Sequence, residues 1–183
     1  MTTHIALLRG INVGKAKRIA MADLRALLED LGYTDVATLL NSGNVVFKAG
    51  KCAPKTLAAD ISAAIATHLG IEVPAIVVSA KELALIVREN PFVSADDPSR
   101  LLVAFVPEAA TLSAMSAIEP HVVAPEQLHV GTHAAYLHCA SGILESKAAE
   151  ALLGKAGKAG KAATTRNWAT VQKLRALVEK IDG

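Results

Sequence analysis

Aromatic residues are scarce in this sequence. Phe, Trp and Tyr make up 3% of the 183 residues, whereas apolar residues of all kinds make up 52%. The core must therefore be built from aliphatic side chains, and few rings remain for stacking on nucleotide bases. Of the expected strands, the first has no Phe, Tyr or Trp and the third offers only Phe47. This scarcity argues against RNA recognition of the RRM type, which stacks bases on rings of the central strands.

The sequence also has few cysteines, no long apolar run and a small net charge. Cys52 and Cys139 are far apart and neither belongs to a CxxC motif, so we expect free thiols in a reducing compartment. No apolar run approaches the length of a membrane span, and the first residues lack the basic region of a signal peptide. We therefore expect a cytoplasmic protein without membrane contact. The net charge of +2 indicates no class of partner.

Metal and cofactor motifs are missing as well. Four histidines lie close in sequence, His121, His129, His133 and His138, but no acid accompanies them as in H-E-x-x-H. His129 and His133 lie on either side of an expected turn, and His138 and Cys139 would point to opposite faces of a strand. We predict no metal site and no cofactor.

Basic residues are concentrated in two segments. Residues 9–18 contain Arg9, Lys15, Lys17 and Arg18 and no acid. Residues 146–175 contain seven Lys and Arg against Glu150 alone. In a nearly neutral chain, these segments predict basic patches on the surface.

The first basic segment follows an expected strand and reads LRGINVGKAKR. It is no Walker A loop, because Gly10 and Gly14 are one residue too close and Lys15 precedes Ala16, which has no hydroxyl for Mg²⁺. A G-x-G-x-x-G fingerprint is also absent. A glycine-containing loop before a helix can still direct backbone N–H groups at one anion, with cations beside it. The alternative is an ordinary connection with solvated lysines.

Hydrophobic periodicity predicts the order β-α-β-β-α-β over residues 3–79, which is the ferredoxin-like plait. The expected strands are residues 4–10, 35–40, 45–49 and 73–79, and the expected helices are 21–32 and 54–70. NSGN at 41–44 is a tight-turn signal between two of these strands.

The second half partly repeats this order. Ser79 and Glu82 form a capping box for a helix at 81–90. The elements expected after it are a strand at 100–106, a short helix at 111–118 stopped by Pro120, a hairpin of 126–130 with 134–139, and helices at 146–153 and from 168. The basic low-complexity stretch 154–162 is expected to be a mobile loop. We predict an α+β protein of two ferredoxin-like halves packed as one compact protein, with domains 1–79 and 80–183.

Several longer motifs resemble one bacterial family. They are LLRGINVGK at 7–15, LRALLEDLGYTDVATLLNSGNVVF at 24–47, NPF at 90–92, SK at 146–147 and TTRNWATVQKL at 164–174. Together they resemble the family called domain of unknown function 1697. The resemblance implies an α/β-plait architecture with two related halves and implies no agreed activity. Relatives usually have glycine in place of Lys15 and asparagine in place of Ala169.

The polar and glycine positions of these motifs fall at the ends of elements, where binding sites tend to lie. We therefore predict that they converge on one face. The predicted ligand-binding residues are Arg9, Gly10, Asn12, Gly14, Lys15, Ser42, Asn44, Lys147, Arg166 and Asn167. Simpler roles are open for some of these residues and their neighbours. Gly43 and Asn44 suit a turn, and Asn167 or Thr165 suits the N-cap of the last helix. Ser146 suits the cap of the helix that it precedes better than the role of a nucleophile activated by Lys147.

Three functions follow from these features. The first is a binding module whose basic, polar face holds a phosphate-bearing ligand, either a nucleotide or a nucleic-acid backbone. The second is an enzyme acting on phosphoryl or acyl-phosphate substrates, since acylphosphatases are plaits with a phosphate cradle before the first helix. In that case Asn41 would join the loop residues. The third is a protein-interaction module in which the loops are purely structural. The sequence leaves the oligomeric state open.

Overall fold

The computed structural model describes residues 1–154 and 162–183. The low-complexity loop predicted at 154–162 therefore lies almost entirely outside the described residues. The chain divides into two compact units, residues 1–83 with 173–183 and residues 84–172. The boundaries fall within two helices, α3 (Ala80–Glu89) and α5 (Trp168–Asp182). The domains 1–79 and 80–183 stay a prediction, which differs from the two units mainly in the assignment of the last eleven residues.

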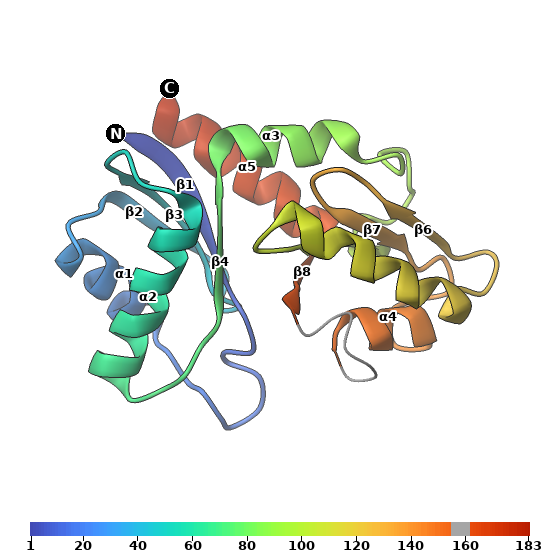
Figure 1. The fold of residues 1–183 in the computed structure, drawn as a ribbon, viewed down its shortest axis with the longest axis horizontal. Coiled ribbons are helices and arrows are strands. Elements are labelled where there is room, and N and C mark those ends of the chain that lie inside the picture. Colours follow the sequence, from blue (N-terminus) through green and yellow to red (C-terminus); the bar gives the residue numbers. More distant parts are fainter. Residues whose placement is uncertain (155–161) are drawn as a thin grey trace. The chain divides into compact units, whose positions relative to one another are not determined.

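The first unit contains a four-stranded antiparallel sheet with the strand order β2-β3-β1-β4. Its elements are β1 (Thr2–Leu8), α1 (Met21–Asp30), β2 (Thr34–Leu39), β3 (Asn44–Ala49), α2 (Pro54–Leu69) and β4 (Ala75–Ser79). Both helices cover the same face of the sheet (Figure 1). This is the predicted β-α-β-β-α-β plait.

Aliphatic spacing explains why these helices form and where they pack. On α1, Leu24, Leu27 and Leu28 share one face and are buried, and on α2 the same holds for Leu57, Ile61 and Ile65. They pack against the sheet residues Ala6, Leu8, Val45 and Phe47. One aromatic pair joins this aliphatic core, since Tyr33 stacks on Phe47 with ring centroids 4.8 Å apart.

The second unit contains another four-stranded antiparallel sheet, in the order β6-β7-β5-β8. Its elements after α3 are η1 (Pro98–Arg100), β5 (Leu101–Phe105), η2 (Ala109–His121), β6 (Gln127–Val130), β7 (Ala135–His138), α4 (Lys147–Leu152) and β8 (Thr164–Asn167). The 3-10 helix η2 and the helix α4 pack on one face, where Leu112, Met115 and Leu152 meet Leu102 and Leu137. The strand order corresponds to that of the first unit, which confirms the prediction of two ferredoxin-like halves.

Some local predictions need correction. The helix expected at 111–118 is the 3-10 helix Ala109–His121, and Pro120 lies within it rather than after it. The fixed φ of proline suits a 3-10 turn, so the helix continues past Pro120 and ends at His121. Thr164–Asn167, expected only to lead into the last helix, forms the edge strand β8 paired with β5. The capping box is confirmed, because Glu82 Oε2 accepts from Ser79 N at 2.8 Å and Ser79 Oγ accepts from Glu82 N at 3.1 Å.

Within the described part of the chain, no helix is both long enough and apolar enough to span a membrane.

Candidate functional site

In the first unit, the β1–α1 loop and the β2–β3 turn are joined by hydrogen bonds. The Asn12 side chain makes one of them and two further hydrogen bonds within the loop. Its Nδ2 donates to Asn41 O at 2.7 Å and to Ile19 O at 2.9 Å, and its Oδ1 accepts from Ile19 N at 2.9 Å. In addition, Leu8 N donates to Gly43 O at 2.8 Å. The structure thus brings together two of the motifs that were predicted to converge.

Gly43 is the residue that permits this close approach. Its φ is +83°, and a Cβ at this position would lie 2.7 Å from Leu8 Cβ and 2.8 Å from Ile11 Cδ1. Any larger residue would be strained in its backbone and would push the loop away. Glycine is therefore required here for two separate reasons.

Asn44 and Ser42, two predicted ligand residues, make hydrogen bonds inside the turn. Asn44 is fully buried, and its Nδ2 donates to Leu39 O and to Ser42 Oγ, both at 2.9 Å. These bonds support the simpler role as turn residues. Contact of either side chain with a ligand stays a prediction.

A pocket of about 390 Å³ lies beside the joint between loop and turn. It is lined by Asn12, Arg18, Ile19, Ala20, Met21 and Asn41. Ala20 is the N-cap residue of α1 and Met21 is the first residue of that helix, so the helix begins at the pocket. Alanine has no side-chain oxygen to cap the first N–H groups. A helix N-terminus of this kind carries a partial positive charge and favours an anion.

The backbone of the loop adds to this character. φ is +68° at Gly10, +55° at Asn12 and +64° at Gly14, while Ile11 and Val13 between them are not in the positive region. Such alternation resembles the backbone nests that direct successive N–H groups toward an anion. One of these N–H groups is already used, because Asn12 N donates to Lys17 O at 3.1 Å.

The cations of the loop differ in their surroundings. Lys17 Nζ donates to Glu72 O at 2.9 Å, and the backbone N–H of Arg9 donates to Pro74 O at 3.0 Å. Lys15 and Arg18 are exposed and form no ion pair with any residue that the structure describes. Of the loop's cations, only Arg18 lines the pocket.

Three predicted ligand residues belong to the second unit. Arg166 Nη1 donates to Thr164 Oγ1 at 3.0 Å and to Thr165 O at 2.8 Å, and burial lowers the pKa of its guanidinium to about 10. Asn167 Oδ1 accepts from Thr170 N at 2.9 Å, so it caps α5. Lys147 begins α4. A ligand role for these three stays a prediction.

The structure also bears on Ser146, on the two cysteines and on possible metal ligands. Ser146 Oγ accepts from Ala149 N at 3.0 Å and thus caps α4, which supports the cap over the nucleophile. Cys52 and Cys139 are free thiols. Over residues 1–154 and 162–183, no group of three His, Cys, Asp or Glu side chains is placed to hold a metal ion.

Arg18 is the charged residue of the pocket lining, and it lies outside the motifs. It belongs to the cations of its segment but not to the ten predicted ligand residues. Asn41 is predicted only for the enzyme alternative. Their positions in the sequence could have identified both residues as pocket candidates. Arg18 lies three residues before the first residue of α1, and Asn41 directly precedes Ser42.

Comparisons with known proteins agree with the resemblance in the motifs. In fold, the chain is similar to the conserved bacterial protein SP0830 from Streptococcus pneumoniae, with a TM-score of 0.80 and 23% identity, over 97% of this chain and 98% of the other. No curated protein matches it in sequence. Residues 1–136 match the family described as protein of unknown function DUF1697, whereas the motifs at 146–147 and 164–174 lie beyond this match. The chain belongs to the DUF1697 family.

Proposed function

We propose that the first unit is a binding module for a phosphate-bearing ligand, held in the pocket between the β1–α1 loop and the β2–β3 turn. The observation that supports this most directly is the lining of the pocket. The exposed cation Arg18, the start of α1 and the turn residue Asn41 meet there. Helix N-terminus and guanidinium both favour the same kind of ligand, a phosphate or similar anion.

The residues of the loop take different parts in this proposal. Arg18 supplies charge and a planar donor set that suits phosphate oxygens. Lys15 and Arg9 add to the positive potential over the loop. Asn12 uses its amide for the loop itself, so it positions the site instead of contacting the ligand. Asp23, in the first turn of α1, is an acid that partly opposes the helix charge.

Binding is favoured over catalysis by what lines the pocket. Its described lining contains no carboxylate, imidazole or thiol that could act as a general acid or base. The enzyme alternative remains testable, because an acyl-phosphate substrate would occupy the same place. Lys147, Arg166 and Asn167 are not needed for the proposal.

The test is a thermal-shift panel of the full chain in low-salt buffer, with phosphate, pyrophosphate, nucleotides, acetyl phosphate, and short RNA and DNA. A ligand at 100 times its Kd adds about 2.7 kcal/mol to folding stability. For 183 residues this corresponds to a rise in Tm of about 5–10 °C. Release of inorganic phosphate from acetyl phosphate would identify an enzyme.

Arg18→Ala is the decisive variant. It should weaken binding of the active ligand roughly tenfold, which is about 1.4 kcal/mol, with little change in the Tm of the free protein. Arg25→Ala is the matched control, because Arg25 is an exposed arginine of α1 outside the pocket lining. A panel without any shift, or an equal loss in both variants, would refute the proposed site.

A further inference from the structure

The edge strand β6 of the second unit has backbone groups available for pairing. Within the described residues, β6 pairs only with β7. Gly131 N donates to Ala134 O at 2.9 Å and closes the hairpin. Because bonded and non-bonded pairs alternate in antiparallel strands, the N–H and C=O groups of Leu128 and Val130 point away from β7. An edge of this kind is a template for another strand.

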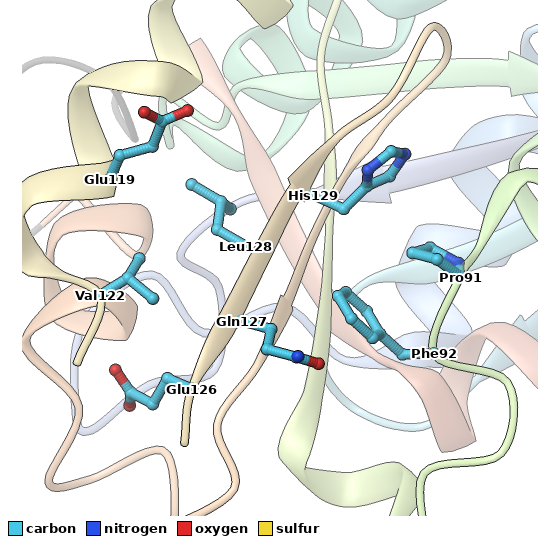
Figure 2. Close-up of a pocket in the computed structure, with 8 residues that line it drawn as sticks. All are labelled: Pro91, Phe92, Glu119, Val122, Glu126, Gln127, Leu128 and His129. Atoms are coloured by element: carbon cyan, nitrogen blue, oxygen red, sulfur yellow. The ribbon is translucent and has the colours of Figure 1, made fainter. Parts of the chain in front are cut away.

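A groove of about 450 Å³ follows this edge. Its lining comprises Pro91, Phe92, Glu119, Val122, Glu126, Gln127, Leu128 and His129. Figure 2 shows Leu128 on the same side of the strand as Glu119, Val122 and Glu126, whereas Gln127 and His129 point toward Phe92 and Pro91. Both faces of β6 therefore contribute walls, and the strand edge lies between them.

The wall on the Phe92 side is held in place. Asn90 is 4% exposed, and its Oδ1 accepts from Phe92 N at 2.9 Å. The Phe92 ring stacks on His138 with centroids 6.0 Å apart. This arrangement gives the Asn90-Pro91-Phe92 motif a structural explanation that the anion site does not provide. A preorganised aromatic surface is suited to an apolar side chain.

The opposite wall is acidic. Glu119 and Glu126 line it beside Val122 and Leu128, and the described lining contains no Lys or Arg. Glu126 Oε2 accepts a long hydrogen bond of 3.4 Å from Val123 N, which leaves the rest of its carboxylate for a partner. A lysine or arginine could lay its aliphatic stem on Val122 and Leu128 and place its charge beside the two carboxylates.

We propose that β6 and this groove dock an extended segment of another protein by strand addition. The segment pairs with the outward N–H and C=O groups of β6. Its side chains alternate between the two walls, with basic residues toward Glu119 and Glu126 and apolar residues toward Phe92. At about 3.3 Å per residue, β6 accommodates roughly four residues of the partner. This site is independent of the anion pocket in the first unit.

The first test measures fluorescence anisotropy of a labelled peptide, KFKVKFK, titrated with the full chain. Phe92→Ala should weaken binding about tenfold, and the double variant Glu119→Gln with Glu126→Gln roughly threefold to tenfold. Glu145→Gln is the matched control, since Glu145 is exposed, belongs to the same unit and lies outside the groove. The acidic peptide EFEVEFE should not bind.

The second test addresses the backbone pairing. Two peptides are methylated on alternate amide nitrogens, one on the odd and the other on the even positions. Strand addition requires that one set abolishes binding and the other preserves it. Equal binding of both, or no effect of the glutamate and phenylalanine variants, would overturn the proposal. A dimer in sedimentation that the peptide dissociates would assign the edge to a second copy of this chain and would also overturn it.

Discussion

Gly43→Ala tests whether the β2–β3 turn holds the β1–α1 loop in place. The substitution places a side chain at φ +83°, which costs about 1–2 kcal/mol. It also places a Cβ at 2.7 Å from Leu8 Cβ and 2.8 Å from Ile11 Cδ1, and overpacking of this kind costs about 1–3 kcal/mol. We therefore expect the free energy of unfolding to fall by about 2–5 kcal/mol in urea titrations followed by circular dichroism.

Gly32→Ala is the matched control for backbone strain. Gly32 has nearly the same φ, +84°, but no described atom lies within 4 Å of a Cβ built there. This variant should lose only the strain, about 1–2 kcal/mol. The difference between the two variants then measures the contact between turn and loop. If both lose the same free energy, Leu8 and Ile11 move aside without cost, and the reasoning on the joint is refuted.

Two further predictions concern pH. Burial lowers the pKa of His4, against a smaller raising effect of Glu82, so below the ordinary value of 6.5 the unfolded chain binds a proton that the folded chain does not. Stability should fall in that range by at most about 1.4 kcal/mol per pH unit, and less in His4→Phe, as urea titrations at several pH values would show. Burial by itself raises the pKa of the Glu89 carboxyl, but hydrogen bonds outweigh it and hold the pKa below its ordinary value of 4.5. The donors are the N–H groups of Thr132 and His133, the Tyr136 hydroxyl and the Ala134 N–H. The contribution of the Glu89 carboxylate to stability is complete above pH 4.5 and is lost as the pH falls below it. Glu89→Gln should therefore be less stable than the unchanged protein at neutral pH and should approach its stability in acid. A difference in the free energy of unfolding that stays constant with pH would contradict this.

The sequence predicts the elements with long periodic patterns and strong turn signals. Leu24, Leu27 and Leu28 mark α1 by their spacing alone, and NSGN marks the turn. The strand β8 lacks such a pattern, because it has only four residues and its two threonines suit a cap as well as a strand. Only the paired strand β5 decides between the two, since Thr165 faces Ala104 and Thr164 faces Phe105.

The site was less predictable because its key contacts cross large sequence separations. Asn12 reaches Asn41 over 29 positions, and no local rule announces this bond. Periodicity and turn chemistry could select the segments but could not distinguish residues that build the loop from residues that face a ligand. Asn12 and Asn44 make hydrogen bonds within the loop and the turn, and Arg18 is the residue that we propose faces a ligand, because it lines the pocket.

This distinction separates a structural account of the loop from a functional one. Asn12 and Gly43 maintain the joint whether or not a ligand binds, so a loss of stability in their variants supports neither account. Arg18 makes no ion pair with a described residue, so a purely structural role of the loop does not explain an arginine at this position. If Arg18→Ala leaves the Tm of the free protein unchanged and removes the shift caused by an anion, the loop is a binding site. If it changes neither, the loop is a structural connection, and the groove along β6 becomes the better place to look for a partner.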